Sequence, residues 1–289
     1  MVRWPGQNLL RAGIARIAVA SGVLLWALMG VGQTQRFQNP PLIATAVDPA
    51  GLIAGDWNGD GHQDLIYVEQ SPTPFLHVLL GNGNGGFNEQ TPVQLPPGTC
   101  SIYFLGGCKL TAGDFNGDGK QDLLMTGETS SGQLFLVLPG NGDGTFGVPV
   151  TSGYGGEFGD YADILYGAVA DFDGNGTLDF AVPDYINGTI AIYTGDGTGH
   201  FFEKGSYSNA NMPFVAFAAD VNKDGNVDLL IGDLNPQGVG IWLGDGHGNF
   251  TEARVYSPAT GCALDAVADM NGDGNVDLVC ETASEPFKS

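Results

Sequence analysis

A nine-residue acidic pattern occurs five times along this chain and constrains its fold more than any other feature. Each copy has aspartate or asparagine at positions one, three, five and nine, and glycine at position six. The copies begin at Asp56, Asp114, Asp171, Asp220 and Asp269, so their spacings are 58, 57, 49 and 49 residues. Repetition at periods of about 50 residues is typical of repeat architectures, in which every copy is one structural unit.

The residues of this pattern are oxygen donors of the kind that calcium prefers. Ca²⁺ takes about six to eight oxygens, so a short loop must turn side chains and a backbone carbonyl inward together. The side chains at positions one, three, five and nine and the carbonyl at position seven can do this, and the glycine at position six permits the positive φ that folds the chain over the ion. The predicted ligands are Asp56, Asn58, Asp60, His62 and Asp64; Asp114, Asn116, Asp118, Lys120 and Asp122; Asp171, Asp173, Asn175, Thr177 and Asp179; Asp220, Asn222, Asp224, Asn226 and Asp228; Asp269, Asn271, Asp273, Asn275 and Asp277.

The pattern matches the first half of an EF-hand loop but lacks the glutamate of position twelve. Apolar strand-like residues, such as 123–125 and 229–231, occupy that region instead. The aspartate at position nine is therefore expected to close the site, within a β-hairpin. A metal-free reading is the alternative, since Asp, Asn and Gly also dominate turns. Three carboxylates within about 4 Å repel one another by a few kcal/mol per pair, which favours a bound cation in each of the five loops.

A second motif, GxGxGxF, alternates with the acidic loops. Its phenylalanine follows its first glycine by six residues, as in Gly81 to Phe87 and Gly140 to Phe146. Apolar stretches such as 134–138 precede it, which predicts a strand entering a tight turn. Each unit then has four strands: two around the acidic loop, one before the glycine turn, and one that starts at the phenylalanine. Four antiparallel strands per unit of about 50 residues predict an all-β fold, a β-propeller of about five repeats.

The spacing of the motifs also predicts a strand near the start of the chain. Phe37 precedes the first acidic loop by 19 residues, as Phe201 and Phe250 precede later loops. We expect 37–47 to be the last strand of a blade, and 277–282 to be the one strand after the fifth loop. Either the N-terminal strand closes a five-bladed ring with one short blade, or the chain is part of a larger propeller; both leave a strand edge to protect.

Residues 1–32 have the pattern of a secretory signal peptide. Arg3, Arg11 and Arg16 precede an apolar stretch at 17–31, and small residues precede Gln33. An uncleaved anchor is the alternative, although the apolar run is short for a span of about 20 residues. We therefore expect a signal peptide at 1–32, a propeller at 33–289, and a secreted or cell-surface location without membrane insertion after cleavage.

The chain is strongly acidic. Its formal net charge is −22, and loss of the three arginines in 1–32 would change it to −25. Fifteen of the 32 acidic residues are loop aspartates. This charge argues against nucleic acid and anionic membrane surfaces as partners.

Four cysteines fit disulfides in an exported protein. We expect Cys100 to pair with Cys108 and Cys262 with Cys280, although four cysteines allow three connectivities.

The sequence contains no catalytic constellation. The four histidines, in turns or on one strand, belong to no HExxH motif, and no GxSxG motif is present. We therefore expect a protein that is not an enzyme. Apolar residues at loop position two (Trp57, Phe115, Phe172, Val221 and Met270) are expected to pack beneath the loops, and Leu138, Tyr193 and Trp242 to lie in the core.

The two alternating motifs together resemble FG-GAP/VCBS repeats, the units of the integrin α-subunit propeller and of many exported bacterial proteins. The resemblance covers 37–289 and implies calcium-binding loops on one rim of a propeller, although the Gly-Ala-Pro tripeptide and the usual seven blades are missing. Three functions follow: a non-catalytic recognition or adhesion module for a glycan or protein ligand, an accessory propeller of a larger extracellular enzyme or surface assembly that continues past Ser289, and a catalytic propeller. The last needs a cluster of His, Arg and Tyr, and is disfavoured by the scarcity of arginine.

Overall fold

The computed structural model describes residues 49–281, except for 70, 72, 98, 100–107, 130–131, 154–166, 185–186, 210–211, 235–236 and 259–260. The predicted signal peptide at 1–32, the predicted strand at 37–47 and its pairing with the last blade lie outside these residues. In the described part of the chain, no helix is long and apolar enough to cross a membrane.

The described residues form five antiparallel sheets, one around each acidic loop. The first has β1 (Pro49–Gly55), β2 (Asp64–Glu69), β3 (Phe75–Gly81), β4 (Phe87–Glu89) and β5 (Val93–Gln94); the second has β6 (Lys109–Gly113), β7 (Asp122–Thr129), β8 (Gly132–Leu138) and β9 (Val150–Gly153); the third has β10 (Ala168–Ala170), β11 (Asp179–Asp184), β12 (Thr189–Gly195) and β13 (Phe201–Ser208); the fourth has β14 (Pro213–Ala219), β15 (Asp228–Leu234), β16 (Gln237–Gly244) and β17 (Phe250–Tyr256); the fifth has β18 (Ala263–Ala268) and β19 (Asp277–Glu281).

These sheets confirm the predicted all-β propeller blades. In each of the first four, neighbouring strands pair in chain order, so the acidic loop joins the first two strands and the glycine turn joins the next two. The predicted start of the fourth strand is wrong in the second blade, where Phe146 makes one isolated bridge to Gly140 and β9 begins at Val150. Pro149 has no N–H for a ladder, which explains the delayed start.

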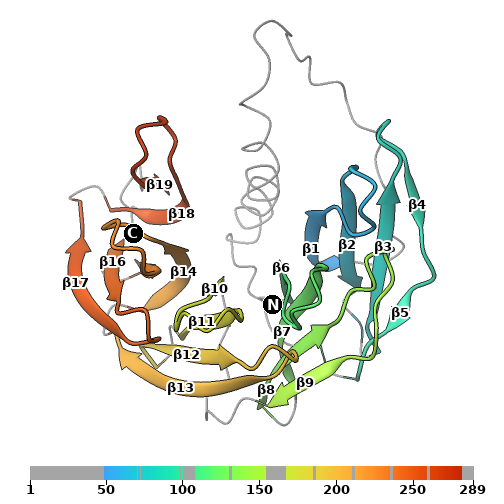
Figure 1. The fold of residues 1–289 in the computed structure, drawn as a ribbon, viewed down its shortest axis with the longest axis horizontal. Helices are drawn as coiled ribbons and strands as arrows, with labels where there is room; N and C mark the ends of the chain where they lie inside the picture. The colour runs from blue at the N-terminus through green and yellow to red at the C-terminus, as the bar shows by residue number, and fades with distance from the viewer. Residues whose placement is uncertain are drawn as a thin grey trace, which may run out of the picture.

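The sheets stand side by side around an open arc (Figure 1). The first strands, such as β1, β6 and β14, face the inside of the arc, and the fourth strands, such as β13 and β17, form its outside. The first sheet and the β18–β19 hairpin lie on opposite arms. Within 49–281, the sheets thus form an arc and not a closed ring.

The core lies between the faces of neighbouring blades. Ile66 and Val78 of the first blade pack in one cluster with Leu123 and Leu136 of the second. The next junction is aromatic: Phe135 meets Phe180 edge to face at 5.4 Å, a geometry that suits the ring quadrupoles. As expected, Leu138, Tyr193 and Trp242 are all buried.

One of the two predicted disulfides is confirmed. Cys262, which directly precedes β18, is bonded to Cys280 of β19. The predicted pair of Cys100 and Cys108 cannot be placed in the same way, because Cys100 lies outside the described residues. The disulfide therefore crosslinks the β18–β19 hairpin, which is the sheet with the fewest strands in the described residues.

Candidate metal centres

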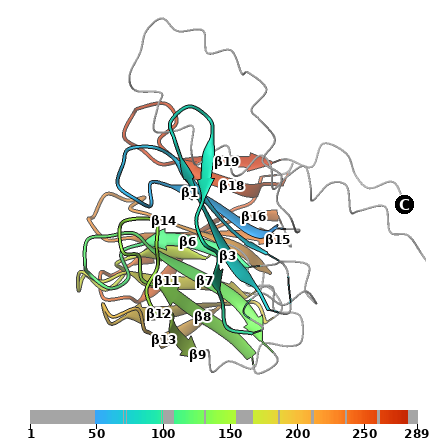
Figure 2. The same cartoon turned by 90° about the vertical axis from the view of Figure 1, so that its right-hand side faces the viewer.

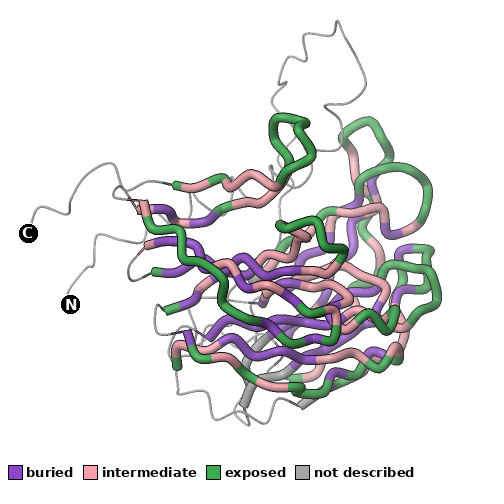
Figure 3. Tube along the Cα trace, turned by 60° about the vertical axis from the view of Figure 1, so that its left-hand side comes forward, coloured by how far each residue is buried: buried purple, intermediate pink, exposed green. Residues whose placement is uncertain are grey.

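The acidic loops and the glycine turns lie at the same end of the blades. This follows from the topology, since the antiparallel order returns the third strand to the end where the first strand finished. Figure 2 shows these loops projecting to one side of the blades, and Figure 3 shows that they are largely exposed. Each of the first four blades thus presents one acidic loop and one glycine turn on a common rim, and the fifth sheet presents an acidic loop.

The aspartate at position one folds each loop around its own side chain. In the second loop, Asp114 Oδ1 accepts the N–H of Gly117 at 2.7 Å and that of Asp118 at 3.1 Å. Its Oδ2 accepts the N–H of Gly119 at 2.8 Å. Gly119 has a φ of 81°, the left-handed region that the pattern predicted for position six. The corresponding bonds from position six recur in the other loops, at Gly61, Gly176, Gly225 and Gly274.

Positions three, five and seven continue the same inward network. Asn116 Oδ1 accepts the N–H of Asp118 at 2.9 Å, and Asp118 Oδ1 accepts the N–H of Lys120 at 2.9 Å. In the first loop, the N–H of His62 is the main cause of a lowered pKa of Asp60, whose ionised form is therefore favoured. The same bond from position five to position seven links Asp60 with His62, Asn175 with Thr177, Asp224 with Asn226, and Asp273 with Asn275.

The aspartate at position nine is held from two directions. In the second loop, Asp122 is fully buried; its Oδ2 accepts the N–H of Phe115 at 2.9 Å and its Oδ1 accepts the N–H of Gly140 at 2.7 Å. Phe115 belongs to the acidic loop, whereas Gly140 opens the glycine turn. The two motifs of a blade therefore meet at this carboxylate. Asp64, Asp179 and Asp228 are fully buried and are held by the same two bonds.

The role of the first glycine in the turn was not predicted from the sequence. A Cβ at Gly140 would lie 1.9 Å from the carbonyl oxygen of Gln121, at position eight of the acidic loop. No side chain fits at that distance, so only glycine lets the turn approach closely enough to bond Asp122. The signal was present in the sequence as the strict alternation of the two motifs. A Cβ at Gly81, Gly195 or Gly244 would likewise lie 2.1–2.2 Å from the position-eight carbonyl oxygen of its own blade.

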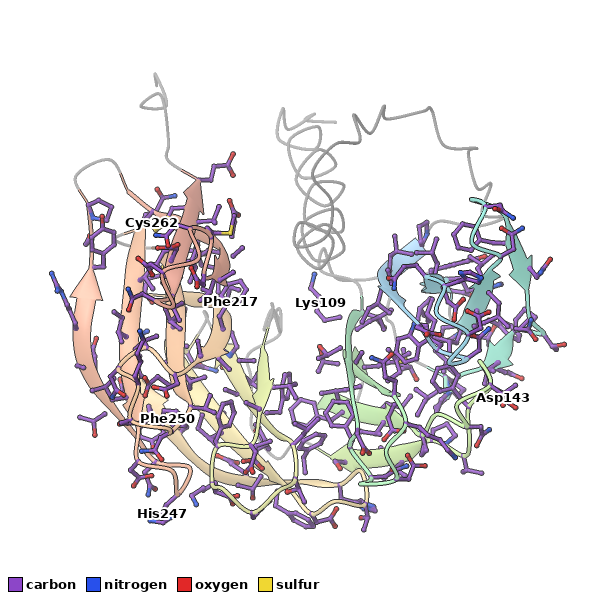
Figure 4. All side chains as sticks on the ribbon, turned by 45° about the horizontal axis from the view of Figure 1, so that its top comes forward. Lys109, Asp143, Phe217, His247, Phe250 and Cys262 are labelled. Carbon is purple, nitrogen blue, oxygen red and sulfur yellow. A yellow bond between two sulfur atoms is a disulfide. The ribbon has the colours of Figure 1, made fainter. Side chains whose placement is uncertain are left out.

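In the first three copies, the residue at position two connects the loop to the following blade. Trp57 is buried and its ring lies 5.8 Å from that of Phe146, the motif phenylalanine of the second blade. Its carbonyl accepts the N–H of Gly144, in the same turn, at 3.0 Å. Figure 4 shows the equivalent turn of the fourth blade, with His247 at its tip and Phe250 at its base. The predicted packing beneath the loops is thus confirmed for Trp57, Phe115 and Phe172, and each packs against the phenylalanine of the next blade.

The last two copies differ. Val221 is partly buried within the cluster shared with β18 and β19. Met270 is 53% exposed, so the predicted packing is wrong for this copy. Its loop is followed, within the described residues, by β19 alone, and no glycine turn covers the methionine.

The charges of the loops fit a cation. In the third loop, Asp171, Asp173 and Asp179 each offer a carboxylate oxygen, and these oxygens lie within 4.8 Å of one another. Burial raises the pKa of the Asp179 carboxyl, and the carboxylates of Asp173 and Asp171 raise it further, against two backbone N–H groups that lower it. Burial likewise raises the pKa of Asp122 in the second loop. A bound divalent cation would offset both the burial and the repulsion, and the all-oxygen donor set suits calcium.

The histidines are not brought together. His62, His200 and His247 are exposed in turns of different blades. His77 lies on β3, where its ring stacks on Tyr67 and its Nδ1 is 2.8 Å from the Glu89 carboxylate.

Comparisons with known proteins agree with this architecture. A family model described as FG-GAP-like repeat matches 56–125, 114–182, 171–231 and 220–280. Each match runs from one acidic loop through the next. No curated protein matches the chain.

Solved structures also match parts of this chain. A protein from Lactobacillus plantarum is 13% identical with a TM-score of 0.53, and the match covers 75% of this chain and 59% of that one. A lectin of Agrocybe aegerita that recognises non-reducing terminal N-acetylglucosamine is 21% identical with a TM-score of 0.49, covering 70% and 50%. The Tc holotoxin pore of Photorhabdus luminescens is 19% identical with a TM-score of 0.45, covering 82% and 11%. The chain thus spans between half and three fifths of the first two proteins.

Proposed function

This chain belongs to the FG-GAP-like repeat family, and from that premise we propose that it is an exported calcium-binding propeller that recognises a glycan or protein ligand without catalysis. The observation that carries the calcium assignment is the buried aspartate at position nine. Asp122 and Asp179 are held against two backbone N–H groups each, while burial, and to a smaller extent neighbouring carboxylates, oppose their ionisation. A cation bound in each loop would supply the positive charge that stabilises the ionised carboxylates.

Calcium would be held by the ligands predicted from the sequence, four side chains and one carbonyl per loop. Bound there, it supplies no reaction chemistry; it neutralises the loop carboxylates and fixes the rim. With five ions the formal charge of the chain without residues 1–32 would change from −25 to −15. The loaded surface still repels polyanions, which favours neutral glycans or proteins as ligands.

Exposed aromatic side chains support recognition. Phe202 on β13 is 59% exposed and Tyr256 on β17 is 45% exposed, both on outer strands of the arc. Aromatic residues combine a large apolar surface with low conformational entropy, and they are enriched where proteins bind ligands. A rigid propeller with such side chains on its outer strands can bind without moving.

The alternative is an accessory propeller within a larger extracellular enzyme or surface assembly. The observation that favours it is the fifth sheet, which has two strands within the described residues where the others have four or more. The second strand of that sheet, β19, presents backbone groups to which further strands could pair.

Binding to a glycan array, with calcium and again with EGTA, tests the proposal. We expect binding to one class of neutral glycan, or to a protein in a parallel screen of surface extracts followed by purified candidates, and loss of that binding in EGTA. Phe202→Ala is the test variant, and Val148→Ala, at another exposed apolar side chain, is its matched control. Equal binding in calcium and EGTA by all variants would contradict the proposal. Export is tested separately by N-terminal sequencing of the secreted protein. We expect the mature chain to begin at Gln33.

A further inference from the structure

A continuous path of hydrogen bonds, through backbone groups and the closing aspartates, runs from one acidic loop to the next. Asp64 closes the first loop and accepts the N–H of Trp57 at 2.9 Å. The carbonyl of Trp57 accepts the N–H of Gly144, in the glycine turn of the second blade, at 3.0 Å. That turn begins at Gly140, whose N–H is bonded to Asp122, the closing residue of the second loop, at 2.7 Å.

The glycine turn in this path is a short and internally bonded segment. The N–H of Asn141 donates to the carbonyl of Thr145 at 2.9 Å, and the two side chains are joined at the same distance. Asp143 adds a bond from the N–H of Thr145 at 3.0 Å. These bonds join the two ends of the turn, so Gly140 and Gly144 belong to one hydrogen-bonded segment.

The same path recurs at the next two junctions. Phe115 accepts the N–H of Gly199 at 3.0 Å, and Phe172 accepts that of Gly248 at 2.8 Å. Each path ends on a buried closing aspartate, Asp179 in the third blade and Asp228 in the fourth. Three consecutive junctions therefore link the first four loops in a row.

We propose that calcium binding at the first four loops is positively coupled between neighbouring blades through these glycine turns, and that the fifth loop lies outside the coupled row. This proposal rests on the proposed calcium function. An ion that fixes the closing aspartate also fixes the peptide of position two, because the aspartate accepts its N–H. The opposite side of that peptide then holds the turn of the next blade, so the neighbouring loop loses less conformational freedom when it binds its own ion.

Within the described residues, no blade follows the fifth loop to extend the row. Met270 is more than half exposed, and in the described chain β18 and β19 are the only strands of this sheet. Its closing aspartate, Asp277, is bonded by the N–H of Met270 at 2.9 Å, within its own loop. In the described residues, the fifth loop thus has the hydrogen bonds within the loop but not the bond to a glycine turn that links neighbouring blades.

Site-resolved NMR can follow every loop separately in the full chain. The position-six glycine of each loop donates its N–H to the position-one aspartate, so its amide resonance reports on occupation of that loop by calcium. In the wild type we expect Gly61, Gly119, Gly176 and Gly225 to titrate with a Hill coefficient above 1, and Gly274 to titrate with a Hill coefficient of about 1 and more weakly.

Two position-five variants then test the path. Asp118→Ala removes a ligand of the second loop, and its side chain takes no part in the bonds between blades. We expect calcium affinity at Gly61 and Gly176 to fall by about fivefold, the lower end of typical coupling. Asp273→Ala, the matched change in the fifth loop, should leave the other four affinities within twofold. If Asp118→Ala unfolds, the milder Asp118→Asn and the wild-type Hill coefficients decide the question.

The outcomes separate the two proposals. Independent titration of all five glycines, or an equal effect of both variants on their neighbours, overturns the coupling and leaves calcium binding intact. If no glycine resonance responds to millimolar calcium, the calcium function itself fails.

Discussion

The third and fifth acidic loops follow the same nine-residue pattern and have the same local bonds around the position-one aspartate, but their surroundings differ. In both, the position-one aspartate accepts three backbone N–H groups, at 2.8–3.1 Å in the third and 2.7–3.2 Å in the fifth. In the third, however, Phe172 is buried beneath Phe250 of the next blade, with ring centroids 5.4 Å apart. In the fifth, Met270 is exposed. The loop sequence therefore sets the turn, and the neighbouring blade determines how firmly it is supported.

The closing aspartates show the same difference. Asp179 is fully buried and bonded both by its own loop and by the glycine turn of its blade. Asp277 is half-buried and is bonded by Met270 of its own loop. We therefore expect metal affinity to depend on the support that the blade gives to the closing aspartate as well as on the nine loop residues.

Removal of calcium should have the largest effect on the free energy of unfolding. At about 1 mM calcium and a Kd near 10⁻⁴ M, each site adds about 1.4 kcal/mol to the free energy of unfolding. Five sites would add about 7 kcal/mol, comparable with the whole stability of a domain. Thermal melts with calcium and with EGTA measure this, and hydrogen exchange should show the greater change in the first four blades. An unchanged Tm would contradict the calcium assignment.

The next effect concerns the close approach that supports the second loop. Gly140→Ala should lower the free energy of unfolding by about 3 kcal/mol, since its Cβ would overlap the carbonyl of Gln121. Gly147→Ala is the matched control, because its Cβ would be 3.6 Å from the nearest atom, an ordinary contact. Urea denaturation compares the two. Equal stabilities would show that the glycine turn does not need this approach.

Lys223 provides a smaller test within the fourth loop. It has a φ of 62° at position four, where the other loops have glycines such as Gly174 with a φ of 72°. A side chain in this region costs about 1 kcal/mol, so Lys223→Gly should raise the free energy of unfolding by about 0.5–1 kcal/mol. Lys223→Ala keeps the backbone strain and removes the charge, so it should not be stabilising. If Lys223→Ala were also stabilising, the gain in stability would come from removal of the lysine charge and not from relief of backbone strain.

The smallest effect is a pKa in the glycine turn of the fourth blade. The side chain of Asn249 and the N–H of His247 lower the pKa of Asp245 to about 2 from an ordinary value of 3.8. The ionised form is therefore favoured in the folded state, so this contribution to stability is present above pH 3.8 and is lost as the pH falls towards 2. Asn249→Ala should move the pKa of Asp245 back towards 3.8 in an NMR titration. An unmoved pKa would show that Asn249 does not hold the turn.

The sequence predicted the repeating parts of this molecule well. Acidic loops, glycine turns and four-stranded blades each have a local pattern, and that pattern sets φ at positions such as Gly119 and the pairing of the strands beside it. The start of a strand was harder to predict where one residue decides it. In the second blade, Pro149 delays the start of β9 to Val150. The short strand β5, which pairs with β3 as a fifth strand, belongs to no repeated motif and was not predicted.

The links between blades could not be predicted, because they depend on which motif of one unit meets which motif of the next. Trp57 and Phe146 are almost 90 residues apart, and their contact follows from the curvature of the arc. The exposure of Met270 has the same origin, since its own loop follows the same nine-residue pattern as the others. The ligand pattern within each loop could be predicted from the sequence. The contacts by which the next blade supports that loop could not.

Calorimetric titration of calcium into the full chain, compared with the Asp122→Ala variant, tests the central claim most directly. That claim is that every acidic loop is a calcium site closed by its position-nine aspartate. We expect five ions per chain in the wild type, with one weaker than the rest, and four in the variant, where Asp114 and Asp118 lose their closing partner. The same count in both proteins, or no heat of binding in either, would contradict it.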